Sequence, residues 1–255
     1  MINKNIPPEH WSKRQAILIL EQDKIDLLYE IPEGKELLLN SECCILTLPL
    51  DENNKTVQEL INSNLDKEGA MLVQNPFYRD RYEELPEISQ KFAMEKYFIF
   101  SALCRYLGAK EVIVEEFEIR KNTVTQKVNL DGKVNITKFD TELKKEINDE
   151  VFQKLNINLT FPGGEPDIEA ACSLLQNTRL ITKNPEMYSL IEMRKGKNNR
   201  LKSSQVMLNL SEETNSIFQF IGTLNLPNYL TKIKIHYENA LTEKSEYTLK
   251  MLVTF

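Results

Sequence analysis

Cysteine and histidine, which commonly serve as nucleophile and base, are few in this chain. Its cysteines are Cys43, Cys44, Cys104 and Cys172. Nucleophilic catalysis needs such a group beside a base, and the two histidines, His10 and His236, pair with none of them in the sequence. The cysteine spacing matches neither a disulfide framework nor a zinc site. Two histidines are also too few for a histidine-rich metal site, so the sequence predicts no metal and no cofactor.

Two carboxylates occur in an order that suggests metal-dependent hydrolysis. Asp167 follows Pro166, and Glu192 is followed by Arg194 and Lys195. This order resembles the outline of Mg²⁺-dependent nucleases of the PD-(D/E)xK type, in which two acids bind Mg²⁺ and a lysine orients water. Here arginine holds the lysine position, and arginine is a poor base. Asp167 also falls at a predicted helix start, where that pattern needs a strand. The nuclease is therefore an alternative function, with these four charged residues as candidates.

Cations gather between residues 194 and 202 of an otherwise acidic chain. They are Arg194, Lys195, Lys197, Arg200 and Lys202. At the tip of a predicted hairpin they would form a binding surface for an anionic partner, either nucleic-acid phosphate or anionic lipid. A run of this kind is also typical of a solvated turn, and both interpretations stay open.

The segment PGGEPD at 162–167 places two glycines at the predicted start of a helix. Backbone amides of such a turn can bind phosphate. However, Glu165, Asp167 and Glu169 surround this start and would repel an anion. We therefore expect a strand-to-helix turn with Pro166 as the first helical residue. The nucleotide-binding patterns G-x-G-x-x-G and G-x-x-x-x-G-K-[ST] do not occur in the sequence.

The composition is that of a folded, acidic protein. The chain has 255 residues, of which 41% are apolar and 27% charged, and its formal net charge is −6. A chain of this length buries a sizeable core without disulfides or metal, and its negative charge argues against broad nucleic-acid binding. No apolar run of about 18 residues predicts a transmembrane helix. The first residues lack the apolar stretch of a signal peptide. These features predict a cytoplasmic protein, with membrane-surface contact left open.

One long helix dominates the predicted elements. Over 88–108, Phe92, Ile99, Phe100 and Leu107 recur at steps of three and four, and further apolar side chains make this helix apolar nearly all round. That pattern is typical of a helix in the centre of a domain. Gly108 follows where a helix commonly ends in a left-handed residue.

The remaining segments predict mainly strands and hairpins. Before the long helix we expect strands at 16–20, 25–31 and 43–50, a turn at 32–35, and a helix capped by Thr56. After it, a strand is predicted at 110–120, followed by hairpins at 124–138, 187–210 and 229–255. The first hairpin turns at Asp131-Gly132. Helices are predicted at 139–155 and after 166, and a short strand is predicted at 157–161. Ser211 would cap a further helix through Phe218 and Ile221, although the aromatic content of this segment leaves a strand open.

These elements predict an α+β fold, in which a mainly antiparallel sheet of hairpins packs around a buried central helix at about 88–107. We expect residues 1–255 to form a single α+β domain. A possible boundary near 75 would separate a strand-rich lobe at 1–75 from a main α+β lobe at 76–255.

Because no reactive set of residues is found, the sequence favours a non-enzymatic cytoplasmic module. It would act through protein–protein contacts as an accessory or regulatory subunit, with a protein partner or a second copy of itself. One alternative is a membrane-acting or pore-forming effector of bacterial type that uses the amphipathic hairpins. The other is the Mg²⁺-dependent nuclease.

Overall fold

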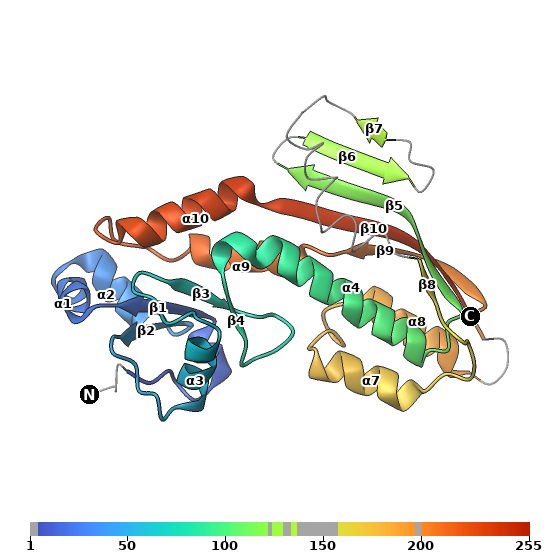
Figure 1. The fold of residues 1–255 in the computed structure, drawn as a ribbon, viewed down its shortest axis with the longest axis horizontal. Coiled ribbons are helices and arrows are strands. Elements are labelled where there is room, and N and C mark those ends of the chain that lie inside the picture. The colour runs from blue at the N-terminus through green and yellow to red at the C-terminus, as the bar shows by residue number, and fades with distance from the viewer. Residues whose placement is uncertain (1–4, 122–123, 130–133, 137–157, 197–199) are drawn as a thin grey trace. The chain divides into compact units, whose positions relative to one another are not determined.

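A computed structural model describes residues 5–121, 124–129, 134–136, 158–196 and 200–255 (Figure 1). The chain divides into two compact units, each built from separate stretches of sequence. Unit 1 consists of Met1–Ile88 and Thr214–Glu243, and unit 2 of Ser89–Glu213 and Lys244–Phe255.

Unit 1 contains a four-stranded sheet with the order β2-β1-β3-β4. Its strands are β1 (Ala16–Leu20), β2 (Cys43–Thr47), β3 (Met71–Gln74) and β4 (Tyr82–Glu84). β1 is parallel to β2 and antiparallel to β3. All five residues of β1 are fully buried. This explains the uninterrupted apolar run AILIL, since a strand covered on both faces has no polar side.

Helices accompany this sheet in unit 1. They are η1 (Trp11–Arg14), α1 (Gln22–Glu30), α2 (Pro32–Leu39), α3 (Lys55–Asn62), η2 (Leu85–Glu87), most of α9 (Glu212–Gly222), and α10 (Thr231–Glu243). Glu68 joins α10 to α1 because its carboxylate pairs with both Lys232 and Lys24. η2 also contacts α10. These contacts explain how α10, distant in sequence, belongs to unit 1.

Three predictions for the N-terminal segments are wrong. Residues 25–31 were predicted as a strand but lie mostly in α1, where Ile25 and Leu28 are buried three residues apart while Leu27 and Tyr29 are about half exposed. The predicted turn at 32–35 is the first turn of α2. The N-cap of α3 is Asn54 and not Thr56, since the Asn54 side chain accepts hydrogen bonds from the amides of Thr56 and Val57.

Unit 2 contains a six-stranded antiparallel sheet with the order β7-β6-β5-β10-β9, and β8 pairs with the start of β5. The strands are β5 (Glu111–Lys121), β6 (Val124–Asn129), β7 (Val134–Ile136), β8 (Leu159–Thr160), β9 (Ser203–Asn209) and β10 (Ser245–Thr254). The β6–β7 pairing confirms the strands of the first predicted hairpin. Its Asp131-Gly132 turn and the predicted helix at 139–155 lie outside the described residues.

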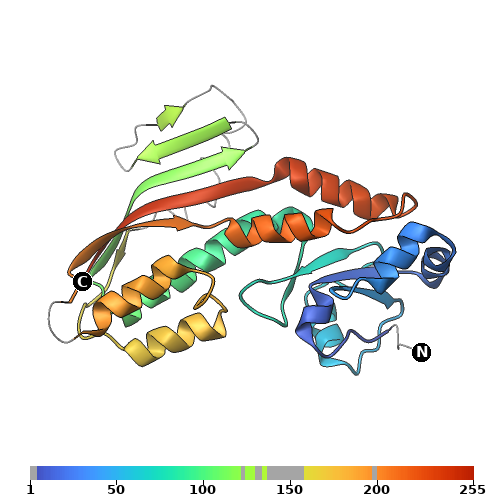
Figure 2. The same cartoon turned by 180° about the vertical axis from the view of Figure 1, so that it is seen from behind.

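Three helices lie along one side of this sheet, as Figures 1 and 2 show. They are α4 (Ile88–Tyr106), α7 (Ile168–Asn177) and α8 (Pro185–Lys195). In α4, the side chains of Phe92, Phe100 and Leu103 have no exposed surface. The α+β class, the mainly antiparallel sheet and the buried long helix are therefore confirmed.

The long helix also carries a buried charge. The Lys96 side chain is fully buried, and its Nζ lies 2.8 Å from both carboxylate oxygens of Glu213. A buried ammonium is tolerated when a carboxylate compensates it at this distance. After α4, Gly108 has a φ of +76°, as a left-handed helix end requires. A Cβ at this glycine would also collide with the carbonyl oxygen of Gly164.

Two of the predicted hairpins are wrong. Residues 187–194 lie in α8 and residues 229–237 lie largely in α10, so 187–210 and 229–255 are helix–strand pairs. Their second strands, β9 and β10, are confirmed. The predicted first residue of α7 is also wrong, because Asp167 is its N-cap and the helix begins at Ile168. Among the helices in the described ranges, none has the length and apolar character needed to cross a bilayer.

Candidate functional site

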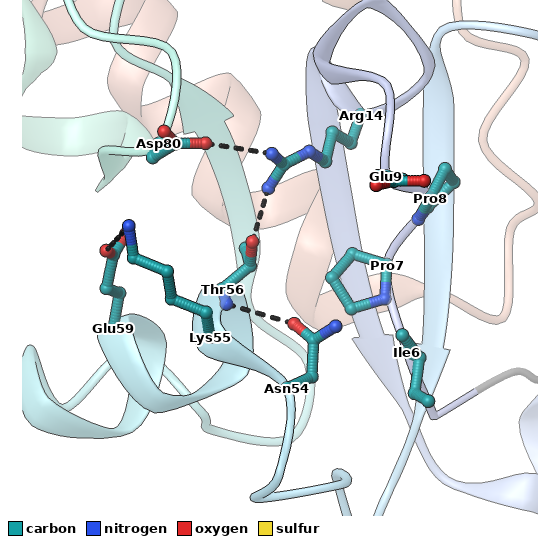
Figure 3. A pocket seen from close by; sticks show the side chains of 10 residues that line it. All are labelled: Ile6, Pro7, Pro8, Glu9, Arg14, Asn54, Lys55, Thr56, Glu59 and Asp80. Atoms are coloured by element: carbon teal, nitrogen blue, oxygen red, sulfur yellow. Dashed lines mark hydrogen bonds and ion pairs between the residues drawn. The ribbon is translucent and has the colours of Figure 1, made fainter.

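A cavity of about 500 Å³ opens in unit 1. Its walls come from residues 6–9, the end of η1, the first turn of α3 and the loop between β3 and β4 (Figure 3). Arg14 lies between the two sides, with Asp80 and Glu59 on one side and Pro7 and Pro8 on the other. The cavity therefore combines charged groups with an apolar wall.

Arg14 is the buried charge of this cavity. The residue is only 5% exposed. One guanidinium nitrogen donates to Thr56 Oγ1 at 2.7 Å, and another donates to Asp80 Oδ1 at 2.9 Å. A guanidinium carries five N–H donors, and Arg14 Nε is buried with no acceptor in the described part of the chain. Because Nε has almost no exposed surface, this donor does not face the cavity.

The start of α3 does not supply an anion site. The Asn54 side chain accepts hydrogen bonds from the amides of Thr56 and Val57, at 2.9 and 3.2 Å. These amides are the groups that would otherwise face an anion at a helix N-terminus. Lys55 and Glu59, one turn apart, form a solvent-exposed pair at 4.0 Å.

The described residues that line the cavity include two cations, Arg14 and Lys55, and three carboxylates, Glu9, Glu59 and Asp80. Arg14 is paired with Asp80 and Lys55 with Glu59. Glu9 is exposed.

The buried groups near Arg14 are not nucleophiles at neutral pH. Burial raises the pKa of Tyr82 to about 12 and the pKa of Cys44 to about 12, although the positive charge of Arg14 opposes both shifts. The Arg14 guanidinium lies 5.9 Å from the centre of the Tyr82 ring. Both groups therefore keep their protons near neutral pH, and neither is a ready thiolate or phenolate.

The two carboxylates of the nuclease hypothesis have separate partners. Asp167 caps α7 by accepting a hydrogen bond from the Ala170 amide at 2.9 Å. Glu192 lies in α8 and pairs with Lys195 on the same helix at 3.6 Å. Glu192 and its neighbours are helical, whereas the nuclease pattern places them on a strand. Within the described ranges, no group of three or more His, Cys, Asp and Glu side chains is arranged to hold a metal ion.

Arg194 was predicted on an exposed hairpin tip, but the structure buries it. It is 6% exposed and lies in α8. Its Nε donates to the carbonyl of Leu107 at 3.0 Å, and another guanidinium nitrogen donates to the carbonyl of Leu201 at 2.8 Å. The guanidinium carbon lies 4.4 Å from the centre of the Phe255 ring. Desolvation lowers its pKa, and the charge of Arg200 adds to this shift. Arg194 therefore links elements within unit 2.

The other cations of that run have different surroundings. Lys195 and Lys202 are exposed, whereas Arg200 pairs with Glu165 and donates to the carbonyl of Gly196. Lys197 lies outside the described residues. An anion-binding role for this run stays a prediction, with Arg194 facing the interior.

Sequence reasoning missed the unit 1 cavity. Its lining residues come from four separate segments, at 6–9, 14, 54–59 and 80, and only the tertiary structure brings them together. The available signal was Arg14 itself, a cation two residues before a strand that is apolar at every position. Such a residue must be paired or surface-exposed, because isolated buried charge is costly.

Comparisons of this chain with protein-family models, with curated proteins and with solved structures find no match.

Proposed function

We propose that this protein is a non-enzymatic module, an accessory or regulatory subunit of the cytoplasm, that binds a partner protein at the unit 1 cavity. Arg14 is the observation that carries the proposal. Arg14 is only 5% exposed, yet it lines an open cavity between Asp80 and the two prolines. A partner segment seated in this cavity would contact an arginine that is already held in place by Thr56 and Asp80.

The chemistry around the cavity supports binding over catalysis. The lining residues that the structure describes include no histidine or cysteine. Cys44 and Tyr82, the groups near Arg14 that could become nucleophiles, have pKa values of about 12. General acid–base catalysis near neutral pH needs groups whose pKa lies close to the working pH. The cavity also places an arginine among polar rim groups, which is a common composition for protein interfaces.

Photo-crosslinking in the native host tests this proposal. A benzophenone amino acid replaces Lys55, whose side chain is 84% exposed at the cavity rim. The matched control replaces Leu39, which is 83% exposed in the same unit but does not line the cavity. We expect a discrete protein adduct from position 55 and none from position 39.

A second variant connects the adduct to the cavity. Arg14→Lys keeps the charge but removes the forked donors, and we expect it to reduce the adduct several-fold. Its thermal unfolding is measured in parallel, so that a folding defect is recognised. The proposal is rejected if no adduct forms at position 55, if position 39 gives the same adduct, or if the folded Arg14→Lys variant leaves the adduct unchanged.

The two alternative functions stay hypotheses with direct assays. For the membrane-acting effector, the assay is dye release from anionic liposomes. For the nuclease, it is metal-dependent cleavage of DNA and RNA by the wild type against Glu192→Gln. No contact in the described residues favours either of them over the binding module.

A further inference from the structure

We propose that β9 pairs in antiparallel orientation with β9 of a second copy of this chain, so that two unit 2 sheets join along this edge. β9 lies at the end of its sheet. It pairs with β10 on one side, and no second strand pairs with it in the described part of the chain. This surface belongs to unit 2 and is independent of the cavity in unit 1.

The register of β9 determines which of its backbone groups point away from β10. The Lys202 carbonyl accepts a hydrogen bond from the Phe255 amide at 2.8 Å. The Leu210 amide donates to the Tyr247 carbonyl at 2.9 Å. Hydrogen bonding alternates along an antiparallel strand, so the even-numbered residues of β9 bond to β10. The N–H and C=O groups at the outer edge are those of the odd-numbered residues, Ser203, Gln205, Met207 and Asn209.

The residues that carry these outward groups are exposed. This holds for all four of them, and Met207 has an exposed fraction of 66%. The Gln205 carbonyl accepts a hydrogen bond from the Ser204 hydroxyl at 3.3 Å, which is long for a hydroxyl donor. A backbone N–H of an added strand would make a shorter bond to this carbonyl. An exposed row of backbone donors and acceptors is a template for pairing with another chain.

β9 lacks the features that keep strand edges from pairing. Natural edge strands are commonly short or bulged, or carry charged residues or proline. β9 has seven residues with neither a charge nor a proline, and its pairing with β10 continues without a register shift. β7, at the other end of the sheet, has three residues. β9 is therefore better suited than β7 to accept a further strand.

Charge favours a second copy as the occupant. The net charge of the chain is −6, so two copies associate best through a surface without charge, and β9 is such a surface. Its flanks have opposite signs, because exposed Lys202 precedes it and Glu212, whose side chain is 54% exposed, follows it. Antiparallel pairing directs each Lys202 toward the Glu212 end of the other copy, whereas parallel pairing would bring like charges together.

Full overlap of the two strands defines the register. A two-fold axis at Val206 pairs Ser203 with Asn209 of the second copy, and Gln205 with Met207 of the second copy. All seven residues then take part, and the outward groups of the odd-numbered residues meet in hydrogen-bonded pairs. The two Met207 side chains lie on the same face of the joined sheet as diagonal neighbours, where they add apolar contact.

Sedimentation velocity of the full chain measures this association. We expect the weight-average mass to rise from 29.7 kDa toward twice that value between about 1 and 300 μM, the range of dissociation constants of small interfaces. Met207→Lys places like charges on either side of the axis, and we expect it to weaken the dimer about tenfold or more.

Met193→Lys is the matched control for this variant. Met193 is 47% exposed on α8 of the same unit and lies outside β9. The same substitution there should leave the measured mass unchanged. Thermal unfolding of both variants shows that they are folded.

Amide hydrogen exchange, resolved by residue in mass spectrometry, tests the strand pairing itself. The amides of Gln205 and Met207 should exchange about tenfold slower or more at concentrations where the dimer forms than where the monomer dominates. The amides of Val206 and Leu208 bond to β10 and should be protected at both concentrations. Neighbouring amides of one strand thus serve as controls for each other, without a substitution.

Five results would overturn the proposal. They are a monomer at every concentration, a dimer that folded Met207→Lys leaves unchanged, a dimer in which the outward amides gain no protection, and outward amides already protected in the monomer, which would mean that the chain covers this edge itself. The fifth is protection that arises only when the protein captured at position 55 is added, because the edge would then belong to that partner.

Discussion

Burial controls the reactivity of the individual cysteines. Desolvation raises the pKa of Cys43 and of Cys44 to about 12 and shifts the pKa of Cys104 upward as well. Cys172 is the partly exposed cysteine of the four. Because the thiolate is the reactive form, we expect iodoacetamide at pH 8 to modify Cys172 first in the folded protein. Peptide mass spectrometry after a time course measures this order.

The Cys172→Ser variant is the control for this prediction. It should show almost no labelling until denaturant is added, after which the other three cysteines should react together. Rapid labelling of Cys44 in the native wild type would mean that the strand β2 (Cys43–Thr47) is not buried as described.

At the scale of the element, α4 holds the core of unit 2. Phe100 has no exposed surface, whereas Phe98, on the same helix, is 53% exposed. We expect Phe100→Ala to lower the free energy of unfolding by about 3–5 kcal/mol, since it leaves a cavity in packed surroundings. Phe98→Ala should cost less than about 1 kcal/mol. Chemical denaturation of both variants compares them, and equal losses would contradict the assigned faces of α4.

The link between α10 and α1 depends on pH. Hydrogen bonds from Lys24 and then from Lys232 lower the pKa of Glu68 in the folded state. A lowered carboxyl pKa stabilises the fold above the unfolded value of about 4.3, and this contribution is lost as pH falls through the folded pKa.

Glu68→Gln tests this link. We expect it to cost about 1 kcal/mol of unfolding free energy at pH 7, since the pairs are partly solvent-exposed. As pH falls through the lowered pKa of Glu68, the wild-type carboxyl loses its charge and the difference between the variant and the wild type should shrink. Urea denaturation over a series of pH values from 7 downward measures this difference. A cost that does not change with pH would show that packing, and not charge, explains the effect of the substitution.

Some elements were predictable from the sequence because their local pattern agrees with their burial. β10 alternates buried and partly exposed residues along its whole length, and α4 has a long apolar stripe. In α8, by contrast, Met187, Leu190, Ile191 and Arg194 are buried. Their spacing of three and four is helical, and Asn184 before Pro185 is a helix start signal. The strand prediction for the short run MYSLIEMR followed its high content of apolar residues and not their helical spacing.

At the scale of the whole molecule, each unit is assembled from segments that are far apart in sequence. β10 lies between β5 and β9 and pairs with both. Its inward side chains, Tyr247, Leu249, Met251 and Val253, are 4% exposed or less. Removing them from the core would cost about 6–12 kcal/mol, which is comparable to the entire stability of a typical domain.

Deletion of residues 244–255 is therefore expected to abolish cooperative unfolding of unit 2. Thermal unfolding followed by near-ultraviolet circular dichroism measures this loss. Lys250→Gln, which changes a residue on the outer face of the same strand, should stay folded within about 1 kcal/mol. A truncated chain that still unfolded in one sharp transition with native packing would show that β10 is dispensable.

The candidate site was less predictable than the elements. Asp167, Glu192 and the 194–202 cations were selected because they are close together in sequence or match a short pattern. The cavity residues share no local pattern, since Arg14, Asn54 and Asp80 meet only through the pairing of β1 with its neighbours and the position of α3. Spatial convergence of distant segments is a property of topology, and a single sequence reports it poorly.

The position of β10 in the sheet also has a consequence for biosynthesis. A ribosome releases β5 and β9 before it has made β10, the strand that must separate them. Until then β9 has no paired strand on the side where β10 belongs, and β5 lacks one of the strands that pair with it. Unit 2 is thus expected to mature only once that strand has emerged, and a nascent chain stalled before residue 245 should depend on chaperones for its solubility.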